Sequence, residues 1–549
     1  MTTLRSSMWI GAAVSLLALG LPATAGEQTI TAKAHRYVMP AGDHFVPHRS
    51  IATRARPLGY AVSKAELDRV KALRGAPDTA DAASEAPEGA RAAGPIIDRV
   101  CTTNSADMWT PSDIHGAVSP SRTVVVTNDA VGVYRRPDCT TLGRVSLEDF
   151  FRNTFHIPQS QGIFDPRVLY DRTNKRFMIT AESSDDFNFD QFQYIAVSTN
   201  ANATDWFQYQ IQLSRGKNFF CKLKPTGFWD YPSAGQSANR WFITANDFPE
   251  GEPEEGGSSP RASATFVPRS ALLSISKEPS LSGDTISIKC FNDLRFNLAP
   301  PIVLDHSTSA FFLSPGGIGQ GEHITRYRLD SPKANATSDT LTSAGAIKVA
   351  AWTAAPNAPQ PNGQRLDSLE GRFQSASIQD GTSLWNVHTI NVNGFARWRL
   401  YKFSTTGKSP LFTVTPSTVV NRDDFLFNPS VTTRSDSPGN PAFVSFSRTI
   451  PSLDKQRGNA AMLIAKGPNS ERAGWGSSLV SKSLDQYEET GYFGGSTSCN
   501  NDPDIHTCRW GDYSAIQIDP ADPTHAVGFN QLIIGRTSKN WTTKEAFVH

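Results

Sequence analysis

The sequence lacks an excess of charge of either sign, because 53 basic residues are balanced by 52 acidic ones for a net charge of +1. A chain without a global positive field has no general attraction for nucleic acid or for an acidic membrane surface. Long amphipathic helices are also scarce, whereas 40 glycines, 36 prolines and 10% aromatic residues are typical of many short strands joined by tight turns. The composition therefore predicts an all-β protein with no nucleic-acid partner.

Long apolar runs are lacking except for one, from Trp9 to Leu21. It follows Arg5 and leads to an Ala-x-Ala site ending at Ala25, which is the pattern of a secretory signal. A retained anchor is the weaker alternative, because a membrane-spanning helix needs roughly 20 apolar residues. We therefore expect residues 1–25 to be a signal peptide. The mature chain should be secreted or periplasmic, with no membrane span.

Cysteine is rare, and no Cys-x-x-Cys motif with a matching histidine pair occurs, so a structural zinc site is not expected. In an oxidising compartment an even number of cysteines favours disulfides over metal ligands. The six cysteines allow 15 connectivities. Proximity in the sequence favours the pairs Cys101–Cys139, Cys221–Cys290 and Cys499–Cys508.

Residues 26–95 differ in composition from the rest of the chain. Ser63 followed by Glu66 forms a capping box ahead of apolar spacing, which predicts one short helix over 62–73. Residues 75–94 are rich in Ala, Pro, Glu and Asp without large apolar side chains, so they cannot bury enough surface to order themselves. We interpret them as a linker or a removable pro-segment that precedes one large domain over 96–549.

A short motif recurs along that domain: an aromatic residue, an acidic residue at the start of a strand, alternating residues and a turn. Its copies lie at 163–171, 228–235 and 509–520. A repeated strand-turn-strand unit is the sign of a modular β architecture. Divided at the expected start of each inner strand, the chain from Pro95 onward gives seven units. Successive starts lie about 50 to 85 residues apart.

Four short antiparallel strands repeated six to eight times form a β-propeller, which has a central channel and only short, protected edges. We therefore expect a β-propeller of seven four-stranded blades, or six if the fourth unit, over 302–352, is a misreading. A β-sandwich is the alternative, although it rarely uses seven similar units over about 450 residues.

The Asp-Pro pair at Asp165 and the Trp-x-Asp-Tyr form at Trp510 and Asp512 resemble secreted bacterial propellers of the sialidase-like, BNR-repeat type. In that family a hairpin between the third and fourth strands carries the Asp-box, roughly Ser-x-Asp-x-Gly-x-Thr-Trp. Residues 198–206 are similar to a degenerate copy, and 537–541 to a weaker one. The resemblance implies the propeller architecture over about residues 95–548.

Sialidases of this family use three arginines, a tyrosine with a glutamate partner, and an aspartic acid. Spacing places only Arg167 and Arg372 near strand starts. A third arginine and the Tyr/Glu pair are not located by spacing, so the resemblance implies architecture and leaves the activity open.

The inner strands of a propeller line its channel, so the residues at their starts gather at one funnel. Carboxylates bind sugar hydroxyls, aromatic faces stack on sugar rings, and two carboxylates roughly 5 to 9 Å apart can act on a glycosidic bond. The predicted catalytic residues are Asp165, Asp230 and Asp512, and the predicted ligand-binding residues are His115, Arg167, Trp229, Tyr231, Arg372, Gln374, Asn428, Trp510 and Tyr513.

A structural interpretation of the same residues is also open. An aspartate before Pro or Tyr can accept neighbouring backbone N–H groups and fix a turn, and recurrence is what that role predicts. His115 is either a general base or a hydrogen-bonded structural histidine. Five further tryptophans are expected to pack between blades: Trp206, Trp241, Trp385, Trp398 and Trp541.

One loop is a candidate calcium site, although no cofactor is otherwise expected. Asp502 and Asp504 lie in an oxygen-rich stretch enclosed by Cys499 and Cys508, and a closed loop of this kind suits a hard cation.

The sequence therefore predicts an exported, monomeric propeller that binds, and as an enzyme cleaves, an extracellular glycan in its central funnel. A glycoside hydrolase or polysaccharide lyase would be the enzyme class. The alternative is a non-catalytic adhesion or protein-interaction module whose partner is a cell-surface protein.

Overall fold

The structure is a computed structural model of the 549-residue chain. It describes residues 27–46, 92–105, 111–158, 161–185, 190–215, 218–223, 227–249, 268–416, 423–433, 440–469, 474–487, 507–535 and 541–549. The predicted signal peptide over 1–25 and the predicted helix over 62–73 lie outside these residues, as does most of the predicted linker.

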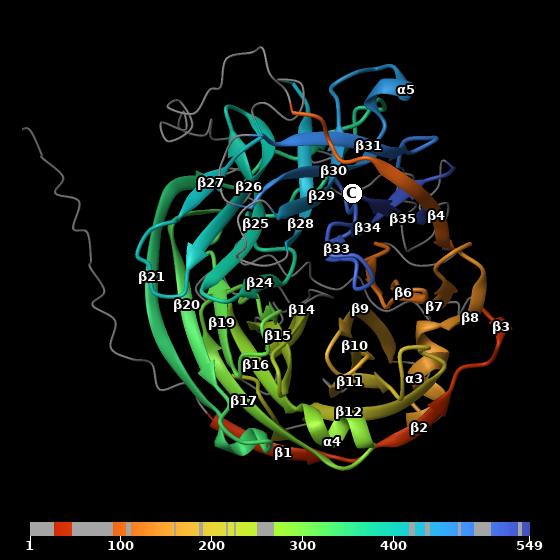
Figure 1. Cartoon of the computed structure of the whole chain (residues 1–549), viewed down its shortest axis with the longest axis vertical. Helices are drawn as coiled ribbons and strands as arrows, with labels where there is room; N and C mark the ends of the chain where they lie inside the picture. Colours follow the sequence, from red (N-terminus) through yellow and green to blue (C-terminus); the bar gives the residue numbers. More distant parts are fainter. Residues whose placement is uncertain are drawn as a thin grey trace, which may run out of the picture.

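The described chain is predominantly β-strand, and its sheets are set around a common centre as in a propeller (Figure 1). The first two sheets follow each other along the chain. One has the order β3 (Gly42–Asp43), β8 (Thr141–Ser146), β7 (Ala130–Arg135), β6 (Arg122–Val126), β5 (His115–Val118). The next has the order β13 (Asn218–Phe219), β12 (Asp205–Arg215), β11 (Asp190–Ser198), β10 (Arg176–Asp185), β9 (Gly162–Asp171), with β2 (His35–Val38) also on β12.

The largest sheet has ten strands. Their order is β1 (Glu27–Ala32), β17 (Ile286–Leu294), β16 (Arg269–Ser276), β15 (Arg240–Pro249), β14 (Gly227–Gln236), β18 (Pro301–Val303), β24 (Ser377–Asp380), β25 (Ser383–Val392), β26 (Phe395–Ser404), β27 (Phe412–Val414). Beside it lies a three-stranded sheet of β19 (Ser309–Ser314), β20 (Gln320–Asp330) and β21 (Thr340–Thr353).

The remaining sheets complete the ring. One comprises β28 (Phe425–Thr433), β29 (Pro441–Thr449), β30 (Ala461–Pro468) and β31 (Gly476–Lys482), and the last β33 (Ala515–Ile518), β34 (Ala526–Ile533), β35 (Trp541–Val548) and β4 (Ile97–Ser105). A small sheet holds β22 (Ala358–Pro359), β23 (Arg365–Leu366) and β32 (Thr507–Cys508). The short helices described are α3 (Leu147–Phe155), α4 (Lys277–Ser282), α5 (Lys455–Gly458) and the 3-10 turn η1 (Ala336–Ser338).

The all-β prediction is confirmed, but the prediction of seven, or six, four-stranded blades is wrong. Counted as continuous hydrogen-bonded sheets of four or more strands, the described residues form a five-bladed arrangement. The short strand β18 pairs in parallel with both β14 and β24, so the predicted third and fifth units share one sheet. The predicted fourth unit supplies the three-stranded sheet. Sequence periodicity identified the strands, yet it cannot show which strand edges pair.

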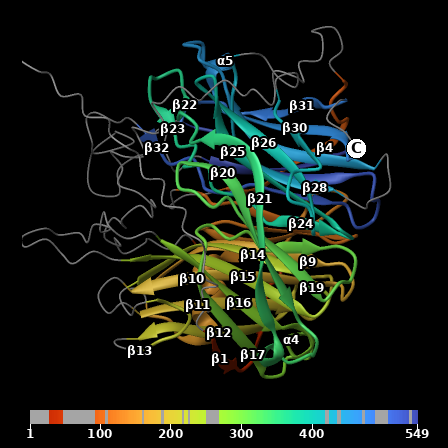
Figure 2. The same cartoon turned by 90° about the vertical axis from the view of Figure 1, so that its left-hand side faces the viewer.

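The N-terminal strands β1, β2 and β3 bind to three consecutive sheets, against β17, β12 and β8 respectively. Figures 1 and 2 show β1 along the outer rim beside β17. Residues 27–46 are therefore attached to the propeller, which their composition did not predict. The strand β4 pairs with β35, so a segment from before the first sheet completes the last one and closes the ring.

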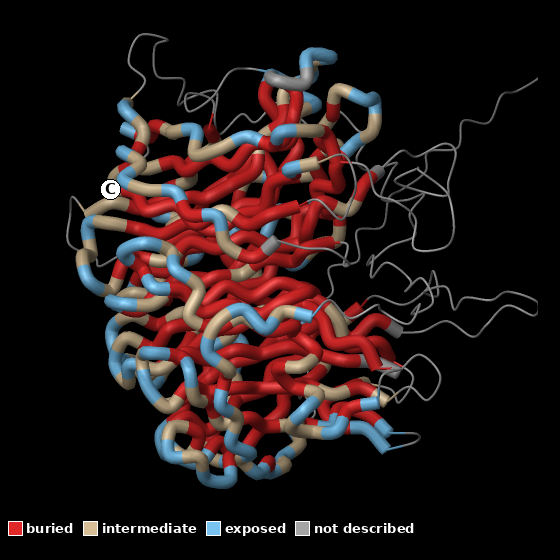
Figure 3. Tube along the Cα trace, turned by 90° about the vertical axis from the view of Figure 1, so that its right-hand side faces the viewer, coloured by how far each residue is buried: buried red, intermediate tan, exposed pale blue. Residues whose placement is uncertain are grey.

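Apolar side chains fill the spaces between the sheets, and exposed residues lie at the rims and turns (Figure 3). The five tryptophans expected to pack between blades are confirmed as core residues: Trp206, Trp241, Trp385, Trp398 and Trp541 are all at most 2% exposed. The inner strand β9 is buried along its whole length. Within the described residues, no helix has the length and apolarity required to cross a membrane.

Two of the three predicted disulfides are confirmed. Cys101 is bonded to Cys139 and Cys221 to Cys290, with Cα–Cα distances of 6.0 and 5.5 Å. Cys508 is also disulfide-bonded, but its predicted partner Cys499 lies outside the described residues, so that pairing stays a prediction. Disulfides are consistent with an extracellular or periplasmic location.

Glu545 on the closing strand β35 should make stability depend on pH. It accepts a 2.6 Å hydrogen bond from Thr123, and burial raises its pKa to about 7. The folded state therefore holds a proton that the unfolded state loses near pH 4.5, so the free energy of unfolding falls as pH rises between these values. We expect a decrease of about 3 kcal/mol across that range, absent in Glu545→Gln. Urea unfolding of both proteins at several pH values checks this, and parallel curves would contradict it.

Candidate functional site

Three inner strands, β9, β14 and β28, carry the same backbone irregularity in their first halves. Asp165, Tyr231 and Asn428 have φ angles of 51°, 62° and 52°, and each precedes a proline. At each place two residues of the inner strand face a single residue of the neighbouring strand. Proline cannot donate to the ladder and is accommodated at such bulges, which also redirect the adjacent side chains. The recurring residue-Pro pair thus builds one end of the central site.

Asp165 lies at the centre of this group. The Tyr513 hydroxyl donates to its Oδ2 over 2.6 Å, and its backbone N–H donates to Asn128 Oδ1 over 2.7 Å. Burial raises the pKa of the Asp165 carboxyl, and the charge of Asp230 raises it further. A carboxyl group in this environment retains its proton to a higher pH than an exposed one.

Asp230 is half-buried and belongs to a cluster of three carboxylates. One carboxylate oxygen from each of Asp165, Glu182 and Asp230 lies within 4.8 Å of the other two. Glu182 comes from β10, the strand that pairs with β9, so its position follows from the sheet register. Like charges this close favour protonation of one member.

Arg167 covers the face of the Tyr513 ring, and its Nε donates to the Pro232 carbonyl over 2.7 Å. The side chain is 2% exposed, and its Nη1 has no hydrogen-bond partner among the described residues. A buried guanidinium with a free donor is suited to a ligand oxygen or carboxylate.

A second arginine and tyrosine face this pair. The Tyr231 and Tyr513 rings are 4.8 Å apart, and the Arg372 guanidinium lies 4.2 Å from the centre of the Tyr231 ring. Arg372 Nε donates to Glu370, whereas the Tyr231 hydroxyl donates to the Asp512 carbonyl over 3.2 Å. The two halves of the site are thus joined through the aromatic pair.

Asp512 is bound by a third arginine, because Arg509 Nη2 donates to its Oδ2 over 2.5 Å. Burial raises the pKa of the Asp512 carboxyl, while Arg509 opposes the change. The Asp512 backbone N–H donates to Asp113 Oδ1 over 2.7 Å, and Asn128 Nδ2 donates to Asp113 Oδ2 over 2.8 Å. Both carboxylate oxygens of Asp113 therefore anchor neighbouring segments, one of which carries Asp512.

Gln374 and Asn428, the two predicted ligand-binding residues with amide side chains, both bind the loop over residues 511–513. Gln374 Nε2 donates to Asn428 Oδ1 over 3.2 Å and to the Asp512 carbonyl over 3.3 Å. Asn428 Nδ2 donates to the carbonyls of Gly511 and Tyr513 over 3.2 and 3.0 Å. These side chains hold residues 511–513 against the neighbouring inner strands.

His115 lies further along the channel and is half-buried. Its Nδ1 accepts the Val168 N–H over 3.4 Å, and burial, with the charge of Arg167, lowers its pKa to about 3. The imidazole is therefore neutral at physiological pH, a state that both interpretations of His115 share, so its role stays a prediction.

Trp229 and Trp510 require a correction. Their side chains are at most 1% exposed, and their indole N–H groups donate to Gln193 and Ser447 over 3.1 and 3.0 Å. A ring packed in the core has no free face for stacking on a sugar, so neither residue serves the predicted ligand contact. Both tryptophans are core residues.

A central cavity that opens to solvent lies along the inner strands. His115, Val168, Ser430 and Ser514 are among its lining residues. The three predicted catalytic aspartates are not among the lining residues that are described; they lie at the other end of these strands. At that end, Asp230 and Arg509 are half-buried, whereas Asp165 and Asp512 are buried.

Sequence reasoning missed four members of the site: Asn128, Glu182, Glu370 and Arg509. Arg509 and Glu370 stand next to predicted residues in the sequence, so their positions offered a signal. Asn128 and Glu182 come from a turn and a neighbouring strand, and only the sheet register brings them here. Asp502 and Asp504 lie outside the described residues, so calcium binding there stays a prediction.

No protein-family model and no curated protein matches the chain. Among solved structures it is similar to a Trypanosoma rangeli sialidase (12% identity, 78% of this chain, 59% of the other, TM-score 0.36). It is also similar to a Fusarium graminearum α-L-arabinofuranosidase (7% identity, 84% and 98%, TM-score 0.36). A third match is a Hadza microbial sialidase (9% identity, 77% and 73%, TM-score 0.35).

The sheets set around a common centre agree with the propeller architecture predicted from the sequence. The chain spans about three fifths of the trypanosomal sialidase. The hairpin over 198–206 lies between β11 and β12, the third and fourth strands of their sheet, where the family carries the Asp-box. Ala203 there has a φ of 57°, and its carbonyl accepts the Trp206 indole N–H over 3.0 Å. The BNR repeat itself stays a prediction, and the weaker copy at 537–541 falls mostly outside the described residues.

Proposed function

We propose that this chain is an exported propeller that binds an extracellular carbohydrate at the starts of its inner strands and hydrolyses a glycosidic bond there. The observation that carries the proposal is the Asp165–Asp230 pair, whose carboxylate oxygens lie within 4.8 Å of each other. Retaining glycosidases hold their two carboxyl groups about 5 to 5.5 Å apart, with one acting as acid and the other as nucleophile. A close pair of carboxylates is what glycoside hydrolysis requires, and for this pair we propose the retaining class.

The environments of the two carboxyl groups suggest different roles. Asp165 is buried and accepts the Tyr513 hydroxyl, and its raised pKa favours the protonated form that a general acid needs. Asp230 is half-buried and serves as the nucleophile on the anomeric carbon. The positive charge of Arg167 acts on Asp165 and favours its ionised form once the proton has been given to the substrate. Protonation of the leaving oxygen by Asp165 and attack by Asp230 would give a glycosyl-enzyme that water then hydrolyses.

The second candidate is a non-catalytic adhesion or protein-interaction module that recognises a cell-surface protein. It is favoured by the way the site residues satisfy one another: Asp113 anchors two loops, Gln374 and Asn428 bind backbone groups, and Arg372 binds Glu370. Hydrogen bonds of this kind hold the inner strands together without any ligand.

A glycan array and a polysaccharide-cleavage screen separate the two candidates. We expect the wild-type chain to bind and cleave at least one glycan class, with retention of anomeric configuration by NMR. The double variant Asp165→Asn, Asp230→Asn should lose cleavage, whereas Asp330→Asn, which alters an exposed ion pair on β20, should not. Equal cleavage by wild type and double variant would remove these residues from catalysis. Binding of a cell-surface protein without any glycan would favour the interaction module.

A further inference from the structure

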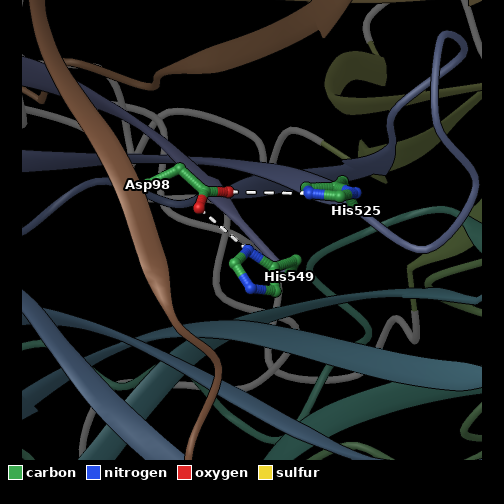
Figure 4. A group of neighbouring side chains, drawn as sticks. All are labelled: Asp98, His525 and His549. Atoms are coloured by element: carbon green, nitrogen blue, oxygen red, sulfur yellow. Dashed lines mark ion pairs between the residues drawn. The ribbon is translucent and has the colours of Figure 1, made fainter.

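Two histidines and an aspartate meet where the ring of sheets closes. Asp98 lies on β4, His525 immediately precedes β34 and His549 immediately follows β35. Figure 4 shows the Asp98 carboxylate facing both imidazole rings, with one oxygen directed at each ring. We infer that these three side chains form a binding site for a divalent transition-metal ion, with zinc as the best-suited ion. The site is separate from the proposed glycan site and does not depend on it.

The backbone fixes the three residues at one corner of the last sheet. Ala526 pairs with Val548, and Val548 pairs with Ile97. Because β34 and β35 are antiparallel, His525, just before Ala526, lies opposite His549, just after Val548. Reciprocal hydrogen bonds of 3.0 and 3.1 Å between Ile96 and His549 extend the ladder by one residue. Each ligand is therefore positioned by sheet register rather than by a free loop.

A β-bulge brings the aspartate to the same side. Arg99 pairs with Phe547 and Ile97 with Val548, so Asp98 is the extra residue between two consecutive pairs. A bulge of this kind redirects one side chain and is frequent beside functional sites. Without the bulge, the regular alternation of side chains along β4 would change the direction in which Asp98 extends relative to the two histidines.

The donor atoms lie close enough to one another to share one metal ion. Asp98 Oδ1 is 2.8 Å from His549 Nδ1, and Asp98 Oδ2 is 3.8 Å from His525 Nε2. One ligand atom from each residue lies within 4.8 Å of the others. Tetrahedral zinc with bonds of 2.0–2.1 Å separates its ligand atoms by about 3.3 Å, which lies between the two observed distances.

A second carboxylate orients His525. Asp522 Oδ2 is 3.0 Å from His525 Nδ1, and the backbone N–H of His525 donates to the Asp522 carbonyl over 3.1 Å. A carboxylate that holds the Nδ1 proton leaves the Nε2 lone pair directed at the ion, which is the common arrangement around metal-bound histidine. This contact is the independent sign that the cluster is arranged for a metal.

The ligand set selects the class of ion. Imidazole nitrogen with one carboxylate suits zinc, copper or nickel, whereas calcium and magnesium require several oxygen ligands. The three side chains are between 32% and 38% exposed, so water can complete the coordination. Because the ligands come from β4 and from the ends of β34 and β35, the ion would cross-link the strand that closes the ring, and its binding would add to folding stability.

The test is calorimetric titration of the EDTA-treated, purified full chain with zinc, together with the visible spectrum of its cobalt form. We expect one tight zinc equivalent in the wild type, at least tenfold weaker binding in His525→Ala and in Asp98→Asn, and roughly 10- to 100-fold weaker binding in Asp522→Asn. Zinc should also raise the melting temperature of the wild type but not of His525→Ala.

His323→Ala is the matched control, because His323 is an exposed histidine beside Glu322 outside the cluster. It should bind zinc as the wild type does. Circular dichroism of each variant checks that it folds, and the exposed Asp98→Asn variant keeps the test valid should either histidine variant fail to fold. A wild type without saturable zinc binding, or variants that bind as tightly as the wild type, would overturn the site.

Discussion

Replacing Asp339 with asparagine should lower the free energy of unfolding by about 3–5 kcal/mol, the cost of leaving one charge of a buried ion pair without its partner. Arg240 and Asp339 both have fully buried side chains, and Arg240 donates to the two carboxylate oxygens over 2.8 and 2.7 Å. Ser274 and Lys289 donate to the Asp339 carboxylate and carbonyl over 2.5 and 2.7 Å. No water could replace these contacts without opening the core.

The pair has a defined structural task. Arg240 begins β15, whereas Asp339 follows η1 in the connection between β20 and β21. The guanidinium also donates to the carbonyls of Lys333, Ala334 and Asn335 over 2.6 to 2.9 Å. Arg240 therefore fastens this connection, and with it the three-stranded sheet, to the ten-stranded sheet.

The exposed pair Arg328–Asp330 is the matched control, with a separation of 2.9 Å and side chains 49% and 37% exposed. Exposed pairs typically contribute between 0 and about 1 kcal/mol, so Asp330→Asn should change stability little. Urea unfolding followed by fluorescence measures both variants. Similar small losses would mean that the buried pair is not what fastens the two sheets.

The periodicity of the sequence and its residue types were sufficient to predict the positions of the strands and part of the site. The Asp165-Pro and Tyr231-Pro pairs marked two inner strands, and the bulges confirm that both prolines stand where the ladder is interrupted. Proximity was sufficient for the Cys101–Cys139 and Cys221–Cys290 disulfides. These features are local, so the sequence carries their signal directly.

The sequence contains no comparable signal for which distant strands pair. The β18 pairings that merge two units and the β4–β35 pairing that closes the ring depend on edges supplied by distant segments. The Asp113–Asp512 contact joins residues 399 positions apart. Trp229 and Trp510 were misplaced for a related reason, because a tryptophan at a strand start looks the same in sequence whether it faces the channel or the core.

Asp165→Asn should reduce glycan hydrolysis by about 10²- to 10⁴-fold, the usual contribution of a positioned general acid. Asparagine keeps the size of the side chain and can still accept the Tyr513 hydroxyl, so binding of the glycan should change far less than turnover. Initial rates and glycan affinity of the variant, measured on the substrate identified by the screen, test this. Wild-type turnover by Asp165→Asn would refute its role as the acid.

The pH profile tests the same role through Tyr513. If protonated Asp165 is the acid, the rate falls as pH rises through its raised pKa, which gives the profile its alkaline limb. The Tyr513 hydroxyl donates to the ionised carboxylate and therefore holds that pKa down, against burial and Asp230, which raise it. Tyr513→Phe should thus move the alkaline limb to higher pH, whereas Asp330→Asn leaves it in place. If the alkaline limb stays at the same pH in Tyr513→Phe, another group donates the proton. Removing the hydroxyl raises the pKa only of a carboxyl group that accepts its hydrogen bond.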